Sequence, residues 1–182
     1  MFGRLFSNKT ISSRLTACLF LIGLIGSACC SGDTPDRPVT EFYNLYLKLK
    51  PLGLPTREQE QTMAPYFSER LRRLLGEARS YQEVFMRKYP EDKPPWADSC
   101  LFASLFEGPK RFRISKVIAN SDGTSTVTVH FWYDTQVADW EDKVIVRREG
   151  GRFVIDDFVL SGAGPFNPPG RLSEMLKDTG EY

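Results

Sequence analysis

The spacing of apolar residues changes after residue 110, and this change most constrains the fold. In the first part, Val39, Phe42, Tyr43 and Tyr46 recur at intervals of three and four, which places them on one helix face. From residue 111, apolar and polar residues alternate, as in "TVTVHFWY" at 126–133, which is typical of a strand with one buried face. The sequence therefore predicts helices followed by strands.

The first part predicts three helices with defined ends. The first follows Pro38 and stops at "KPLGLP", residues 50–55. Thr56 and Gln59 have the spacing of a capping box for a short helix to about residue 64. Ser68 can cap an amphipathic helix of about 20 residues that ends before the proline-rich loop 89–98. Asp98 is then expected to cap a further helix.

The second part predicts four strands, at 111–119, 126–133, 142–148 and 152–160. The turn signals "NSDG" at 120–123 and "EGG" at 149–151 separate strands, and links this short allow only antiparallel pairing. A final helical turn or two is expected in "RLSEMLKD", 171–178. The predicted class is α+β: N-terminal helices packed on a curved antiparallel sheet of about four strands, with a concave pocket between the two layers.

The N-terminus has the layout of a secretory signal. Residues 15–25 are apolar or glycine apart from Thr16, and Arg4, Lys9 and Arg14 precede or border them. At about 1.5 Å per residue this run is too short for a comfortable transmembrane span. We expect residues 1–28 to be a signal peptide that is removed after Ala28.

The small residues "GSA" followed by Cys29 resemble a bacterial lipobox, in which the cysteine after the cleavage point is lipidated. Ser27 and Ala28 fit the pattern, whereas Gly26 stands where a branched apolar residue is usual. The prediction is lipidation at Cys29, a spacer over 29–37 and one domain over 38–182, in a bacterial cell envelope with the anchor in a membrane facing the periplasm. The alternative is an ordinary secretory signal and a soluble secreted or periplasmic product.

Composition and cysteine content narrow the function classes. The chain has 24 basic and 23 acidic residues, and three of the basic ones belong to the leader, so no positive footprint for nucleic acid remains. Cys30 and Cys100 could form a disulfide in an oxidising compartment, or Cys100 could be a buried free thiol. With one histidine and no metal-ligand spacing, we expect no metal site and no cofactor.

The order of elements and three motifs resemble the nuclear-transport-factor-2-like, or cystatin-like, superfamily, and within it an uncharacterised family of secreted and lipid-anchored bacterial proteins. The motifs are "VTEFYNLYL" at 39–47, "DSCLFASLFEG" at 98–108 and "GRFVIDDFVLSG" at 151–162, in which Phe153 stands where tryptophan is more usual. The resemblance implies three helices before a curved antiparallel sheet. It implies no activity, because this superfamily holds both enzymes and plain binding domains.

Enzymes of the resembled fold can use a pocket carboxylate as a base with a tyrosine as hydrogen-bond donor. The candidate pocket residues here are Tyr43, Tyr46, Tyr133, Asp156 and Asp157. Tyr133 shares its strand face with Val127 and is expected to point inward. Asp156 and Asp157 fall on opposite faces of an apolar strand, so one of them should be buried and hydrogen-bonded. The alternative role for that carboxylate is to hold a loop or cap a helix.

His130 and Trp132 alternate away from the valine face and are expected on the outer face of the sheet, where a homodimer or another partner could bind. The leading hypothesis is a non-enzymatic lipoprotein that binds a small apolar ligand or a protein. The alternatives are a small isomerase- or dehydratase-like enzyme, and a periplasmic inhibitor or immunity-type protein that binds a partner around Trp96.

Overall fold

The computed structural model describes residues 1, 3, 33–105, 107–134, 137–162 and 169–177. The chain divides into two units, Met1–Ser31 and Gly32–Tyr182, and the second contains every described helix and strand. The predicted signal peptide, apart from Met1 and Gly3, and residues 29–32 of the predicted spacer lie outside the described residues, so both stay predictions. A search of the described helices found none with the length and apolar content needed to cross a membrane.

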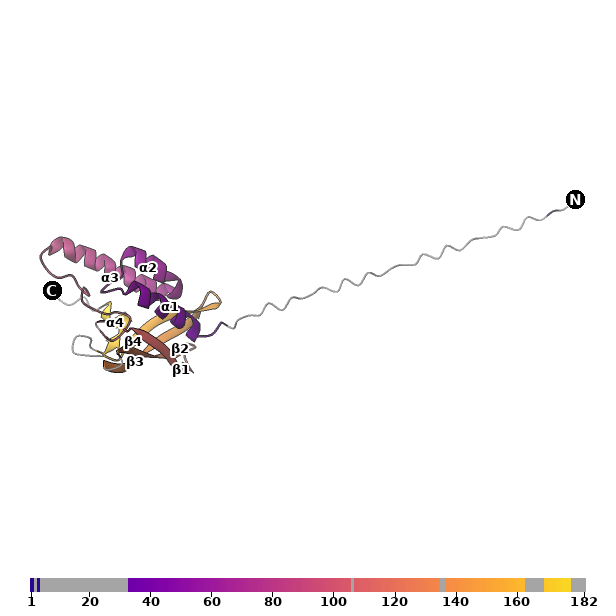
Figure 1. Ribbon diagram of the computed structural model, residues 1–182. Coiled ribbons are helices and arrows are strands. Elements are labelled where there is room, and N and C mark those ends of the chain that lie inside the picture. The colour runs from indigo at the N-terminus through magenta and orange to yellow at the C-terminus, as the bar shows by residue number, and fades with distance from the viewer. Residues whose placement is uncertain (2, 4–32, 106, 135–136, 163–168, 178–182) are drawn as a thin grey trace. The chain divides into compact units, whose positions relative to one another are not determined.

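Four helical segments precede the sheet in the chain (Figure 1). They are α1 (Asp36–Leu49), α2 (Arg57–Met63), the 3₁₀ turn η1 (Ala64–Tyr66) and α3 (Glu69–Lys88). The three predicted helices are therefore confirmed. Helix α1 begins earlier than expected, inside the segment 29–37 that the sequence predicts as a spacer.

Local sequence sets the ends of these helices. The Thr56 hydroxyl accepts the Gln59 N–H at 3.2 Å and the Gln59 side chain accepts the Thr56 N–H at 2.9 Å, which completes the predicted capping box of α2. Ser68 accepts the Leu71 N–H at 3.1 Å and caps α3. Helix α1 ends at Leu49, because Lys50 has a left-handed φ of 43° and Pro51 cannot continue the helix.

The expected helix after Asp98 is wrong. Residues 98–105 are irregular, although Cys100, Leu101 and Phe102 are buried. Side chains elsewhere in the fold take the backbone groups that a helix would use: Tyr43 donates to the Phe102 carbonyl at 2.9 Å, and the Ser104 N–H donates to Asp142 at 2.9 Å. Tertiary hydrogen bonds thus replace the helical ones in this segment.

The described residues form a five-stranded sheet that is antiparallel throughout, and its strands follow one another in chain order. The strands are β1 (Arg111–Ala119), β2 (Ser125–Asp134), β3 (Val137–Glu149), β4 (Arg152–Leu160) and β5 (Gly170–Arg171), and α4 (Leu172–Met175) follows. The α+β class is confirmed. The expected count of about four strands misses β5, because two residues carry no periodic signal, and α4 shows that the helices are not all N-terminal.

The β3–β4 hairpin turns at Gly150 and Gly151, whose φ values of 58° and 83° are both left-handed. Two consecutive positive φ angles match a two-residue turn whose twist suits an antiparallel hairpin, and glycine adopts them without steric cost. The signal "EGG" therefore has the role that the sequence predicts.

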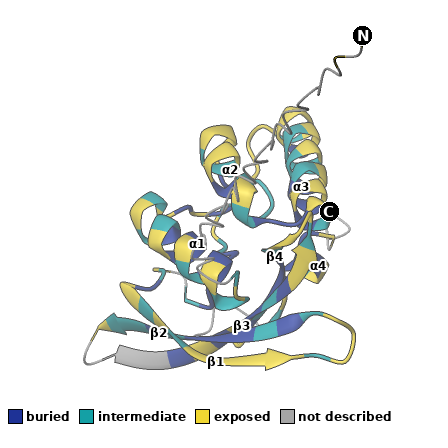
Figure 2. Ribbon diagram, turned by 90° about the vertical axis from the view of Figure 1, so that its right-hand side faces the viewer, coloured by how far each residue is buried: buried dark blue, intermediate teal, exposed yellow. Residues whose placement is uncertain are grey.

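The two faces of the sheet differ as the alternation predicts. Val127, Val129 and Phe131 of β2 are fully buried toward the helices, whereas Thr126, His130 and Trp132 lie on the opposite face and are half-buried. Figure 2 shows α1, α2 and α3 on one side of the sheet and the largely exposed β1 at its edge. The core therefore lies between the helices and one sheet face.

Aromatic side chains fill the space between these two layers. Ring centroids in this group are separated by 4.9 Å (Tyr43–Phe131) to 6.4 Å (Tyr43–Phe158), mostly edge to face or tilted, distances at which aromatic pairs attract. The fully buried rings are Phe42, Tyr43, Phe67, Phe102, Phe131 and Phe158. The concave pocket expected between helices and sheet is therefore occupied at its centre by the protein's own side chains.

The outer edge of β4 is covered rather than left open. Phe67 forms an isolated parallel bridge with Ile155, and the Ser68 N–H donates to the Ile155 carbonyl at 2.8 Å. Further along, β5 pairs with Val159 and Leu160. These contacts satisfy backbone groups that would otherwise be free to form hydrogen bonds with a strand of another chain.

Candidate functional site

A surface recess opens where the end of α1, the segment before β1 and the end of β2 meet. Its volume is about 370 Å³. We call it the Tyr133 recess, and its lining residues are Tyr46, Lys50, Pro51, Leu52, Cys100, Glu107, Gly108, Pro109, Lys110 and Tyr133. The structure thus brings two of the predicted pocket residues, Tyr46 and Tyr133, into one site.

Tyr46 and Cys100 are the buried members of this lining. The Tyr46 Oη lies 2.8 Å from the Cys100 Sγ, and both residues are almost completely buried. Burial raises the pKa of the Tyr46 hydroxyl well above its ordinary value and also raises the pKa of the Cys100 thiol. Both groups are therefore neutral at physiological pH, and this part of the recess carries no charge.

The segment before β1 approaches Tyr46 closely. Gly108 has a φ of 69°, and a Cβ atom at this position would lie 3.5 Å from the Tyr46 Oη. The Lys110 N–H donates to the Trp132 carbonyl at 2.9 Å and so ties this segment to the end of β2. Backbone contacts therefore shape the recess on this side.

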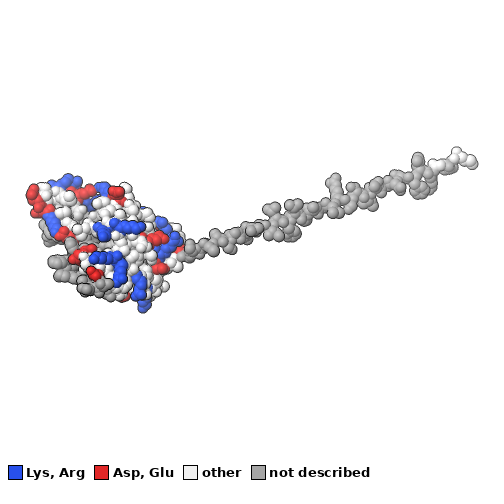
Figure 3. Space-filling view, in the orientation of Figure 1, with Lys and Arg blue, Asp and Glu red and all other residues white. Residues whose placement is uncertain are grey.

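The rim combines apolar surface with charge. The Lys110 Nζ lies 4.4 Å from the centroid of the half-buried Tyr133 ring, and Leu52 is 53% exposed. Lys50 and Lys110 contribute two positive charges against the single carboxylate of Glu107. On the face that Figure 3 shows, basic and acidic side chains are interspersed. Because salt screens charges that lie far apart, the charge of a surface site depends on the side chains next to it. The recess suits a small ligand with an apolar body and one anionic group.

Tyr43, a third predicted pocket residue, lies in the core and not in the recess. It is fully buried, and its hydroxyl donates to the Phe102 carbonyl at 2.9 Å. Burial raises its pKa well above the ordinary value. Tyr43 therefore holds the irregular segment 98–105 against α1.

Asp156 lies at the start of α3, away from the recess. Its carboxylate accepts the Ser68 hydroxyl at 2.6 Å and the Arg70 Nε at 3.2 Å, and its carbonyl accepts the Arg70 Nη2 at 2.9 Å. Because Ser68 caps α3, Asp156 fixes the beginning of that helix on β4. This placement corresponds to the alternative role, in which the carboxylate has a structural function.

Asp157 contacts the C-terminal elements β5 and α4. It is 1% exposed and accepts the Ser173 hydroxyl at 2.7 Å, the Ser173 N–H at 3.1 Å and the Arg171 Nη1 at 3.2 Å. A register shift near Ile145 and Val146 of β3 accompanies the two adjacent buried aspartates. Asp157 thus attaches β5 and α4 to the sheet.

A third buried carboxylate, Asp142, was not among the sequence-derived candidates. It is 1% exposed on the inner face of β3 and accepts the Ser161 N–H at 2.8 Å, the Trp140 Nε1–H at 3.1 Å and the Ser104 N–H at 2.9 Å. The hydroxyls of Ser104 and Ser161 also donate to it. Asp142 lies at alternate positions from Val144 and Val146 in the sequence, and this spacing could have identified it as an inward-facing residue. An acidic residue at such a position must find several hydrogen-bond donors.

Cys100 is a free, buried thiol in the described structure. Cys29 and Cys30 lie outside the described residues, so the lipidation and the Cys30–Cys100 disulfide stay predictions. Among the described residues no group of three or more His, Cys, Asp or Glu side chains is placed to hold a metal ion.

His130 and Trp132 do lie together on the outer face of the sheet. Their rings stack with centroids 4.3 Å apart, and the Arg111 guanidinium lies 4.9 Å from the centroid of the Trp132 ring. Arg113 pairs with His130 and Lys116 with Thr128 across β1 and β2, so both belong to this face. A symmetric contact here would bring like charges together, and the homodimer stays a prediction.

Comparisons of this chain with protein-family models, with curated proteins and with solved structures found no match.

Proposed function

We propose that the protein is a bacterial cell-envelope lipoprotein, anchored through Cys29, whose domain binds a ligand and catalyses no reaction. The anchor rests on sequence: a basic and apolar leader, small residues before Cys29, and a polar segment after it. We further propose that the α+β domain belongs to the nuclear-transport-factor-2-like superfamily. The order of helices before an antiparallel sheet supports that assignment.

The anchor is tested by growth of an expressing bacterial strain with labelled palmitate. The wild-type protein should acquire label and fractionate with membranes, and Cys29→Ala should do neither. Cys30→Ala is the matched control, since it changes the neighbouring thiol only, and should behave as the wild type. Cys29→Ala protein that still acquires label and still fractionates with membranes would refute anchoring through Cys29.

The observation that carries the binding function is the Tyr133 recess next to a filled core. A ligand site inside the domain would have to displace the buried rings of Phe42, Phe102 and Phe158, at a cost of several kcal/mol. The recess instead offers preformed apolar walls at Tyr133 and Leu52 and two lysines. We therefore propose a small amphipathic anion as its ligand, bound with its apolar body against Tyr133 and its charge toward Lys110.

A fluorescent probe with this chemistry is 8-anilinonaphthalene-1-sulfonate, which has an aromatic body and one sulfonate. We expect it to bind the folded protein with 1:1 stoichiometry. Tyr133→Ala should weaken binding by about tenfold and Lys110→Ala by about threefold. Lys116→Ala, an exposed lysine on β1 outside the recess, is the control. Equal affinity for all four proteins would refute this site.

The enzymatic and inhibitor alternatives have less support. The inward carboxylate Asp142 is saturated by donors, and the recess carboxylate Glu107 is exposed, so it lacks the apolar surroundings that make a general base. Trp96, the expected centre of an inhibitor surface, is half-buried and donates its indole N–H to the Met175 carbonyl at 3.0 Å. Its polar group is engaged within the fold.

A further inference from the structure

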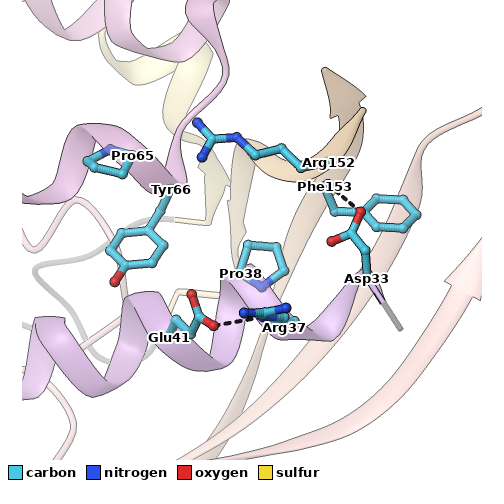
Figure 4. A pocket seen from close by; sticks show the side chains of 8 residues that line it. All are labelled: Asp33, Arg37, Pro38, Glu41, Pro65, Tyr66, Arg152 and Phe153. Atoms are coloured by element: carbon cyan, nitrogen blue, oxygen red, sulfur yellow. Dashed lines mark hydrogen bonds and ion pairs between the residues drawn. The ribbon is translucent and has the colours of Figure 1, made fainter. Parts of the chain in front are cut away.

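A second hollow lies between the start of α1, η1 and the start of β4. We call it the α1–β4 hollow, and its volume is about 330 Å³. Figure 4 shows Pro38, Pro65, Tyr66 and Phe153 as its apolar and aromatic lining, with Arg152 extending over it. No part of the proposed ligand binding uses it.

The chain enters the described domain at this hollow. The Asp33 carboxylate accepts the Phe153 N–H at 3.2 Å and lies 3.6 Å from the Arg148 Nη1, so Asp33 is fixed to β4. Cys29 precedes Asp33 by four residues, and four residues span at most about 14 Å. If Cys29 carries the lipid, as the proposed function states, the α1–β4 hollow is held within reach of the membrane surface.

Among the residues that the structure describes, one cation of the hollow has no charged or hydrogen-bonding partner. Arg37 is paired with Glu41 at 2.9 Å, and Asp33 is engaged by Arg148 and the Phe153 amide. The guanidinium of Arg152, in contrast, makes no hydrogen bond or ion pair with the other described residues, and Figure 4 shows it directed over the hollow. A guanidinium can bind a phosphate through two parallel hydrogen bonds.

We propose that this end of the domain docks on the bilayer, with the phosphate of an anionic phospholipid headgroup held in the α1–β4 hollow by Arg152. The proximity of the anchor supplies headgroups at high local concentration, so one cation is enough to favour this orientation by about fivefold. The proline and aromatic walls accommodate the glycerol and upper acyl region of that lipid. Docking turns the Tyr133 recess, at the other end of α1, away from the membrane.

The test uses the mature protein, lipidated at Cys29, in vesicles of phosphatidylcholine, with and without three-tenths phosphatidylglycerol. Amide hydrogen exchange is followed by mass spectrometry. With the anionic lipid, exchange in peptides covering 33–41 and 148–155 should slow by about fivefold, the factor that one basic residue near an anionic surface contributes. Arg152→Gln should abolish the slowing and Arg152→Lys should retain part of it. Arg73→Gln, an exposed position on α3, is the control.

The outcomes separate the two proposals. Protein that never enters the vesicle fraction refutes the anchor, and the docking that depends on the anchor is refuted with it. Anchored protein with the same exchange in both vesicle types, or with slowing that survives Arg152→Gln, overturns the headgroup site. If glycerol 1-phosphate in solution slows the same peptides without vesicles, the hollow is a site for free anions and the docking proposal is overturned.

Discussion

The carboxylate of Asp142 accepts the indole N–H of Trp140 at 3.1 Å, two residues earlier on the same inner face of β3. The same carboxylate accepts backbone N–H groups from Ser104 and Ser161, which belong to segments far apart in the chain. A buried charge in a sheet interior is tolerated only with such a full set of donors. Asp142 therefore joins the irregular segment 98–105 and the end of β4 to the centre of the sheet.

Asp142→Ala should lower the free energy of unfolding by about 3 kcal/mol or more, because several buried donors lose their acceptor at once. Asp142→Asn should cost less than alanine, since it keeps the shape and one acceptor oxygen. Urea denaturation measures both. Glu141→Gln on the exposed side of the same strand is the control and should change the stability by less than about 0.5 kcal/mol. A similar small change for Asp142→Ala would contradict the network.

Stability should fall at alkaline pH. Burial raises the pKa of Tyr43 and Tyr46 above 10.0 and that of Cys100 above 9.0, their ordinary values. Above about pH 9 the unfolded chain releases protons that the native protein retains, so the free energy of unfolding decreases as pH rises. Urea midpoints at pH 7, 9, 10 and 11 should decline progressively. Replacing the ionisable hydroxyl in Tyr46→Phe should make the decline shallower, and an unchanged slope would show that this residue does not contribute.

Two glycines with similar backbone angles should respond differently to alanine. Gly53 and Gly123 have φ values of 68° and 81°. A Cβ atom on Gly53 would lie 2.7 Å from the Trp96 carbonyl oxygen, whereas a Cβ atom on Gly123 would have no described heavy atom of another segment within 4 Å. Gly123→Ala should cost about 1 kcal/mol through the left-handed conformation alone. Gly53→Ala should cost at least about 1 kcal/mol more. Thermal denaturation of the two variants checks this, and equal melting temperatures would be inconsistent with the close approach.

The two helix caps should also differ in how much they contribute to the free energy of unfolding. Ser68 is fully buried and bonds both the Leu71 N–H and Asp156, whereas Thr56 is exposed and bonds Gln59. Thr56→Ala should cost about 1 kcal/mol, as an exposed cap does. Ser68→Ala should cost about 2 kcal/mol or more, because it also removes one partner of a buried carboxylate. Urea denaturation of both variants provides the comparison, with Ser80→Ala on the exposed side of α3 as a control.

Features with a local cause are predictable from this sequence. Thr56, Ser68 and the Gly150–Gly151 pair act on neighbouring backbone, so their effects follow from residue type and spacing. The alternation in β2 likewise assigns Val127 to the core and His130 to the outer face, because successive side chains of a strand point to opposite sides.

Features that depend on distant partners are not predictable in this way. Residues 98–105 have an amphipathic composition, but Tyr43 and Asp142 take their backbone groups, and neither is a sequence neighbour. The Tyr133 recess arises from segments that meet only in the folded domain. The sequence identifies Tyr46, Tyr133, Asp156 and Asp157 as candidate pocket residues. The residue types alone do not show that only the two tyrosines line the recess.

NMR distinguishes, residue by residue, a ligand site at the Tyr133 recess from one inside the filled core. Backbone ¹H–¹⁵N correlation spectra are recorded during titration with 8-anilinonaphthalene-1-sulfonate. We predict that the largest shift changes occur at the amides of Lys50, Gly108, Lys110 and Tyr133, with Val127 and Val129 unmoved. Shifts concentrated at Val127, Val129 and Phe42, with the recess amides unchanged, would show that ligand enters the interior and that the Tyr133 recess is not its site.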